Sequence, residues 1–177
     1  MVEDHPVTRA DLRLVLEDAG FEVCGDARDG VEAIELARTH RPDLVVMDLG
    51  LPRVDGIEAI RQIRDERNTP VVALTGHREG YLIEQAMQVG AAAYVLKPFH
   101  DAELVGAVTR TLADHRARQA SDTETERRHH LTRIESMLRD GYNEREIMRA
   151  LKDVDPSAHD HAEPKTWIRA LRDSLGR

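Results

Sequence analysis

Residues 45–56 read VVMDLGLPRVDG, and this stretch decides the fold. Its first three residues are an apolar run suited to a strand that is buried on both faces, as in a parallel sheet. The run ends on Asp48, and Gly50 and Pro52 then indicate a loop. A carboxylate at the tip of a buried strand adds nothing to folding. It therefore indicates a functional site on the loops at one edge of a sheet.

The pattern around this stretch alternates between helical periodicity and short apolar runs. Helical periodicity is found in residues 8–18, 30–38, 56–67, 79–89 and 101–112, and the runs are residues 21–24, 44–47, 71–74 and 92–96. This alternation predicts an α/β fold with a doubly wound parallel sheet. Only Met1 and Val2 precede the acidic pair Glu3 and Asp4. We therefore expect the first strand to be largely missing, and apolar residues added before Met1 to raise stability.

Chemically distinctive residues follow the predicted strands. They are Glu3 and Asp4, then Asp48, Thr75 and Lys97. In a doubly wound sheet, ligands bind outside the carboxyl ends of the strands. Carboxylates that lie close together repel one another, and a hard divalent cation with oxygen ligands, Mg²⁺, removes that conflict. With a lysine and a threonine hydroxyl, such a set suits a phosphoryl group, whose transfer needs positioning and charge neutralisation.

Four motifs carry a resemblance to a known family. The segments VEDHP (2–6), MDLGLPRVDG (47–56), ALTG (73–76) and YVLKPF (94–99) occur in this order. Together they resemble the receiver domain of two-component response regulators, over about residues 1–113. The resemblance implies a flavodoxin-like fold and Asp48 as the acceptor of a phosphoryl group from a sensor histidine kinase. It implies no enzymatic activity beyond self-phosphorylation and dephosphorylation.

The resemblance also assigns a role to each site residue. It implies that Asp4 and Asp48 are direct Mg²⁺ ligands, with the Gly50 carbonyl as a third ligand and Glu3 acting through water. Gly50 stands where a haloacid-type phosphatase needs a second aspartate. That enzyme class is therefore excluded.

The remaining roles concern the phosphoryl oxygens and the response to phosphorylation. The resemblance implies that Thr75 and Lys97 bind the phosphoryl oxygens, and that Thr75 and Tyr94 form a switch. It also implies a cis peptide between Lys97 and Pro98, and cis peptides are essentially confined to proline. We expect phosphorylation to change the face around Tyr94 and to produce a homodimer.

The remainder of the chain is predicted to be a separate helical module. We place the receiver at residues 1–115, a polar linker at 116–128 and an output module at 129–177. Residues 114–128 are almost entirely polar, which fits either a helical extension or a flexible tether, with a flexible piece expected around residues 120–125. Beyond the linker, three apolar stripes predict short helices, and Asn143 with Glu146 forms a capping box for the second one.

Three hypotheses remain open for this module. Residues 137–151 are similar to the first half of a LuxR-type helix-turn-helix, and residues 166–176 then supply a recognition helix. Lys165, Arg169 and Arg172 form a basic edge suited to phosphates. This favours transcription regulation by DNA binding. However, residues 153–164 separate the two helices, where the motif has a turn of about 3–4 residues.

The second hypothesis is RNA binding, and the third is a protein-docking or dimerisation bundle. The segments PVVALT (70–75) and GAAAYVLKPF (90–99) resemble receivers attached to ANTAR domains, which are three-helix RNA-binding antiterminators that follow a helical linker.

Charge and composition limit these alternatives. The chain has 25 basic and 33 acidic residues. Residues 1–115 contain 12 of the basic and 21 of the acidic residues, so this acidic part is not expected to bind nucleic acid. The rear carries a net charge of only +1. The single cysteine and the lack of an apolar run of about 20 residues predict a cytoplasmic protein without a membrane segment.

Overall fold

The structure, a computed structural model, describes residues 1–52, 56–76, 80–152, 168–169 and 171–173. It divides into two compact units, Met1–Ala117 and Arg118–Arg177. Among the described helices, none offers the length of apolar chain that crossing a membrane requires.

The N-terminal unit contains a parallel sheet in the order β1-β2-β3. Val45 pairs with Val71 at the start of β1, and Thr75 pairs with Leu96 at the end of β2. The elements in chain order are α1 (Pro6–Asp18), α2 (Gly30–His40), β1 (Val45–Asp48), α3 (Gly56–Arg67), β2 (Val71–Thr75), α4 (Gly80–Gln88), β3 (Ala93–Leu96) and α5 (Asp101–Arg139).

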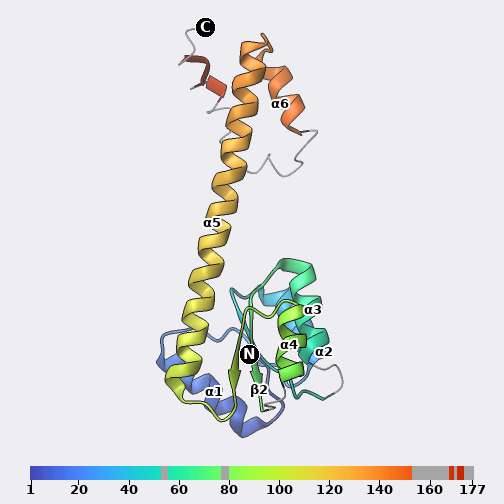
Figure 1. Ribbon diagram of the computed structural model, residues 1–177, viewed down its shortest axis with the longest axis vertical. Coiled ribbons are helices and arrows are strands. Elements are labelled where there is room, and N and C mark those ends of the chain that lie inside the picture. The colour runs from blue at the N-terminus through green and yellow to red at the C-terminus, as the bar shows by residue number, and fades with distance from the viewer. Residues whose placement is uncertain (53–55, 77–79, 153–167, 170, 174–177) are drawn as a thin grey trace. The chain divides into compact units, whose positions relative to one another are not determined.

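Helices cover both faces of this sheet, because side chains alternate between the two faces along each strand (Figure 1). Met47 and Ala73 belong to a hydrophobic cluster with residues of α2, α3 and α4. Val46 and Val72 belong to a second cluster with residues of α1 and α5. The predicted doubly wound α/β fold is confirmed.

The prediction of a strand at residues 21–24 is wrong, since this segment has no strand pairing. Ala27 alone forms an isolated parallel bridge to Val2, and Val2 forms a second bridge to Met47. A strand requires a continuous ladder of hydrogen bonds to a neighbour, and here the neighbour is represented only by Met1 and Val2. The apolar composition of residues 21–24 is therefore not sufficient for a strand.

The helix α5 continues through the predicted linker to Arg139. Residues 116–129 are all exposed, and the flexible piece expected around residues 120–125 is helical instead. Residues 107–139 contain neither glycine nor proline, and alanine, arginine, glutamate and glutamine are strong helix formers. Helix propensity thus accounts for order in a segment that buries almost nothing.

The C-terminal unit has a small core of its own. Among the described residues, those buried in this core are Ile134, Leu138, Ile147, Leu151 and Ile168. The capping box before α6 (Glu144–Lys152) is confirmed, since Asn143 N–H donates to the Glu146 carboxylate at 2.8 Å and Glu146 N–H donates to Asn143 Oδ1 at 3.2 Å. Gly141 ends the preceding helix with a positive φ of 88°, which favours glycine.

Candidate functional site

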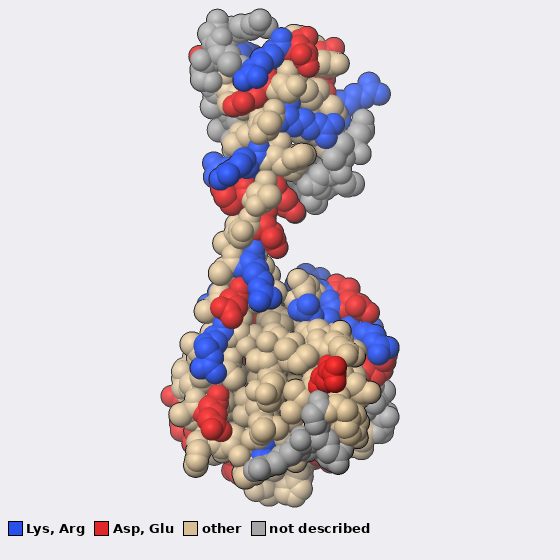
Figure 2. Space-filling view, in the orientation of Figure 1, with Lys and Arg blue, Asp and Glu red and all other residues tan. Residues whose placement is uncertain are grey.

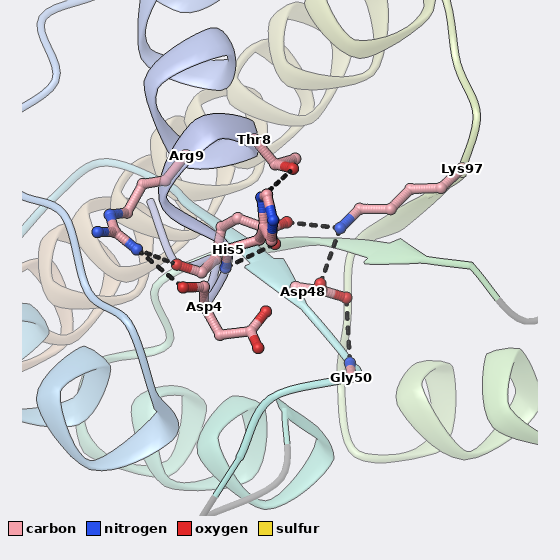
Figure 3. A network of polar contacts seen from close by, with 8 residues as sticks. Asp4, His5, Thr8, Arg9, Asp48, Gly50 and Lys97 are labelled. Carbon is pink, nitrogen blue, oxygen red and sulfur yellow. Dashed lines mark hydrogen bonds and ion pairs between the residues drawn. The ribbon is translucent and has the colours of Figure 1, made fainter.

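The predicted site residues converge at one edge of the sheet (Figure 3). Asp48 ends β1, Thr75 ends β2, and Lys97 follows β3 directly. The bridges of Val2 bring the next two residues, Glu3 and Asp4, to the same edge. One carboxylate oxygen from each of Glu3, Asp4 and Asp48 lies within 4.8 Å of the other two. Parallel alignment of the strands thus joins residues that are up to 94 positions apart.

Lys97 is the positive charge at the centre of this cluster. Its Nζ donates to the Glu3 carboxylate at 2.5 Å and to the Asp48 carboxylate at 2.7 Å. Burial by itself disfavours the ammonium, but the hydrogen bonds to Asp48 and Glu3 outweigh it and raise the pKa of Lys97. Lys97 is therefore a permanent cation that two carboxylates share.

The three carboxylates differ in their access to solvent. Glu3 and Asp48 are 2% and 8% exposed, whereas Asp4 is an exposed residue. The Glu3 carboxylate forms an ion pair with Lys97 and also accepts a hydrogen bond from His5 N–H at 3.2 Å. Asp4 is the carboxylate that an incoming ion meets first. The roles of Asp4 as a direct ligand and of Glu3 as an indirect one stay predictions.

The cluster fits a magnesium ion on chemical grounds. Three carboxylates and one ammonium leave two negative charges in a small volume, and Mg²⁺ prefers a site with few carboxylates that leaves room for water. Gly50 N–H donates to Asp48 Oδ1 at 3.0 Å, which fixes the orientation of that carboxylate. The role of the Gly50 carbonyl as a ligand stays a prediction.

The two switch residues lie in different surroundings. Thr75 is fully buried at the end of β2, whereas Tyr94 is 46% exposed on β3. The predicted cis peptide between Lys97 and Pro98 is confirmed. The coupling of Thr75 to Tyr94 stays a prediction.

Sequence reasoning missed one residue that shapes the acidic turn. Arg9, on α1, donates from one guanidinium nitrogen to the Glu3 carbonyl at 2.7 Å and to the Asp4 carbonyl at 3.3 Å (Figure 3). Arg9 thereby holds the backbone that presents both acids. Periodicity gives no signal for this role, because a polar helix position is usually a solvated one.

Gly56 was missed as well, although its signal was present in the VDG motif. A Cβ at Gly56 would lie 2.4 Å from the Asp48 carbonyl oxygen and 2.7 Å from the Leu49 Cα. Both contacts involve backbone, which cannot move away easily. Only glycine allows α3 to begin directly against the end of β1. A larger residue at position 56 would displace the backbone of Asp48.

The basic edge predicted in the C-terminal unit is described in part. Arg169 and Arg172 are exposed and follow Ile168, which is fully buried in the core of this unit. Lys165 lies outside the described residues. On the face that Figure 2 shows, basic and acidic side chains intermingle over this unit without a continuous basic surface.

Comparison with known proteins identifies the class that this fold and site define. The family model of the response regulator receiver domain matches residues 1–109. The chain therefore belongs to the response regulators of two-component systems.

Among curated relatives, the transcriptional regulatory protein PdtaR of Mycobacterium tuberculosis H37Rv is 37% identical over 171 residues, which cover 96% of this chain and 78% of that protein. The response regulator UvrY of Escherichia coli K12 is 39% identical over 110 residues, 61% of this chain and 50% of that protein. The first match covers almost the whole chain and therefore most of the C-terminal unit, whereas the second is shorter than the N-terminal unit alone.

Solved structures agree on the fold of the N-terminal unit. A LuxR-family two-component response regulator from Aurantimonas sp. SI85-9A1 is 40% identical with a TM-score of 0.60, and the match covers 64% of this chain and 82% of that one. A DNA-binding response regulator of the LuxR family from Staphylococcus aureus is 27% identical with a TM-score of 0.60, over 63% of this chain and 95% of that one. The flavodoxin-like fold is thereby confirmed.

Proposed function

We propose that the N-terminal unit accepts a phosphoryl group on Asp48 from the phosphohistidine of a sensor histidine kinase. The main support for this proposal is that Glu3, Asp4 and Asp48 lie together with Lys97 at the strand ends. Bound by these carboxylates, Mg²⁺ would supply charge neutralisation for the transferred group. It is a resident cofactor of the proposed reaction.

The transfer forms one bond and breaks one. An Asp48 carboxylate oxygen attacks phosphorus, the bond from phosphorus to the histidine nitrogen breaks, and that ring takes up a proton. The Lys97 ammonium lies 2.7 Å from the Asp48 carboxylate. It can break its ion pair with Glu3 and bind the negatively charged phosphoryl oxygens on Asp48. In this proposal Thr75, at the end of the adjacent strand, donates its hydroxyl to a phosphoryl oxygen.

Intact-mass spectrometry with Mg²⁺ and acetyl phosphate tests this proposal. We expect one phosphoryl adduct in the native chain and none in Asp48→Asn. Asp43→Asn serves as the matched control, since Asp43 is an exposed aspartate outside the acidic cluster, and it should keep the adduct. An adduct that persists in Asp48→Asn would remove Asp48 from its role.

We further propose that the C-terminal unit regulates transcription by binding nucleic acid under the control of Asp48. Support comes from PdtaR, whose name includes transcriptional regulation and whose match covers most of this unit. The continuous helix α5 favours RNA, because a helical linker before three helices is the ANTAR-like layout. The exposed pair Arg169 and Arg172 is the candidate contact for phosphates in either nucleic acid.

DNA binding is the second candidate, because LuxR-family proteins are among the structural relatives. Fluorescence anisotropy with mixed-sequence RNA and DNA over a salt series separates the two. We expect RNA to bind more tightly, with an affinity that falls as salt rises. Tighter DNA binding would select the second candidate, and no binding to either would leave a docking or dimerisation bundle.

Transmission from Asp48 is proposed to proceed through association of two phosphorylated copies. Phosphorylation adds about −1.5 to −2 charge at pH 7, which Lys97 and Mg²⁺ must balance. The surface beside the site carries exposed hydrophobic side chains on α4 and β3, namely Tyr81, Met87, Tyr94 and Leu96. Such side chains favour contact with a second copy when the switch at Thr75 changes this surface.

A further inference from the structure

Arg9 lies where a positive charge does not favour a helix. It belongs to the first turn of α1, and the N-terminus of a helix has a partial positive charge that disfavours a neighbouring cation. Among the described residues of α1, none in this turn is acidic, and His5 forms no side-chain cap. The Arg9 guanidinium reaches back to the carbonyls of Glu3 and Asp4 (Figure 3). A departure from a local rule of this kind indicates a functional reason for the side chain.

The backbone of the acidic turn depends on the hydrogen bonds from Arg9. Up to Glu3 N–H, which donates to the Ala27 carbonyl at 3.0 Å, the chain is held by bridges of the parallel sheet. Beyond that point the strand pairing ends. In the described part of the chain, the carbonyls of Glu3 and Asp4 accept hydrogen bonds only from Arg9, at 2.7 and 3.3 Å. Arg9 therefore holds the segment that the sheet no longer holds.

The three carboxylates of the cluster differ in how they are oriented. Each oxygen of Glu3 and of Asp48 accepts a hydrogen bond, either from Lys97 or from a backbone N–H. Among the described residues, none donates a hydrogen bond to the exposed Asp4 carboxylate. The direction of the Asp4 side chain thus depends on the backbone of its turn, and this backbone is held by Arg9.

We propose that Arg9 is a positioning residue of the magnesium site, which acts by holding the turn that presents Asp4 beside Glu3 and Asp48. This inference rests on the proposed function, because it concerns the cation that the phosphoryl transfer requires. The two hydrogen bonds keep Asp4 where one of its carboxylate oxygens lies within 4.8 Å of an oxygen of each other acid. In this role Arg9 contacts neither the cation nor the phosphoryl group.

The charge of Arg9 has the opposite effect on metal binding to its hydrogen bonds. Removal of a positive charge beside the acidic cluster strengthens Mg²⁺ binding, because it removes Coulomb repulsion. Removal of the two hydrogen bonds weakens Mg²⁺ binding, because Asp4 is no longer held in a conformation suited to the ion. Arg9 is only half-buried, so solvent screens its charge, and we expect the effect of the hydrogen bonds to dominate. The sign of the change in affinity therefore separates the two roles.

Calorimetric titration of the full chain with Mg²⁺, without a phosphodonor, tests this inference. We expect Arg9→Met to weaken binding about fivefold, less than the loss of Asp4 itself, because Arg9 orients this carboxylate and does not replace it. Arg9→Lys should be intermediate, since the ammonium keeps the charge but lacks the rigid guanidinium. The matched control is Arg110→Met, which removes an exposed arginine of α5 and should not weaken binding.

Two further measurements show whether Arg9 acts through Asp4. The double variant Arg9→Met/Asp4→Asn should bind Mg²⁺ no more weakly than Asp4→Asn, because residues that act as one unit are not additive. In Arg9→Met, hydrogen exchange should become faster at His5 N–H, which donates to Glu3 in the acidic turn. Asp48 N–H, which donates to the Val2 carbonyl in the sheet, should keep its protection.

Binding of Mg²⁺ by Arg9→Met that equals or exceeds that of the native chain overturns the inference, since Arg9 would then act only as a charge. The inference is also overturned if the losses of affinity multiply in the double variant. Loss of protection at Asp48 N–H in Arg9→Met would overturn it too, because Arg9 would then support the whole unit. If the native chain neither binds Mg²⁺ nor forms a phosphoryl adduct, the proposed function fails as well. A native chain that does both confines the failure to Arg9.

Discussion

The two units of this protein differ in what their residues reveal. In the N-terminal unit, Glu3, Asp48 and Lys97 come from three distant segments and form one cluster within hydrogen-bond distance. In the C-terminal unit, apolar stripes build a core to which five of the described residues contribute buried side chains, and the described surface carries mixed charges. Converging polar groups restrict the chemistry of a site, whereas an apolar stripe only shows that a helix packs.

The same difference extends to stability. The N-terminal unit has a hydrophobic cluster on each face of its sheet, but the described part of the C-terminal unit has one small cluster. A small core leaves each of its residues with a larger share of the total stability. Substitutions should therefore separate the units clearly.

The largest effect is expected from Ile147→Ala. Ile147 is fully buried in the C-terminal cluster, and such a truncation costs about 2–5 kcal/mol. Hydrogen exchange resolved by segment should show loss of protection throughout α6, while β1 and β2 keep theirs. Arg145→Ala, an exposed change on the same helix, should stay within about 0.5 kcal/mol of the native chain. Loss of protection in both units would mean that they unfold as one.

Lys97→Met should destabilise the N-terminal unit by about 3 kcal/mol in a chelator, because buried Glu3 loses its ion-pair partner. Added Mg²⁺ should restore part of that loss. The control is Arg116→Met, whose exposed pair with Asp43 spans 3.6 Å and should contribute less than about 1 kcal/mol. Urea titration with and without Mg²⁺ measures both variants. If both variants lost the same free energy of unfolding, Lys97 would not be the main charge partner of the acidic cluster.

The ligand order predicts a smaller effect. Asp4→Asn should weaken Mg²⁺ binding about tenfold, because under the proposed ligand order the ion loses a direct carboxylate ligand from the exposed Asp4. Glu3→Gln should weaken it less, because Glu3 is predicted to act through water and is already ion-paired with Lys97. Isothermal calorimetry compares them. A larger loss in Glu3→Gln would reverse the order.

The smallest effect is expected on the charged surface of the C-terminal unit. Arg169→Ala and Arg172→Ala should each lower nucleic-acid affinity about threefold and reduce the slope of its salt dependence by about one. Arg110→Ala, an exposed change in the N-terminal unit, is the control for net charge. Unchanged slopes in both variants would place the interface elsewhere.

The sequence was sufficient for the N-terminal fold and its acidic cluster, because Asp48, Thr75 and Lys97 each follow a clear apolar run. The structure brings them together as expected. The strand at residues 21–24 was predicted wrongly, because local composition contains no information on whether a neighbouring strand completes the ladder. The role of Arg9 could not be predicted for a related reason, since its hydrogen-bond partners are backbone carbonyls rather than side chains.

In the C-terminal unit, the sequence predicts local features but not the ligand. Its capping box at Asn143 and its buried Ile147 were predictable, because both depend on neighbours within a few residues. The helical state of residues 120–125 was not, because polar composition alone does not distinguish an exposed helix from a tether. Its ligand was not predictable either, since the charges on its described surface are mixed.

Control of the C-terminal unit by Asp48 is tested most directly by nucleic-acid affinity with and without beryllofluoride, a phosphoryl mimic, in Mg²⁺. The native chain should bind at least about fivefold more tightly with the mimic, which is the lower end of typical coupling between sites. Asp48→Asn should show no change. Equal affinity of the native chain in both conditions, or the same increase in Asp48→Asn, would contradict control through this aspartate.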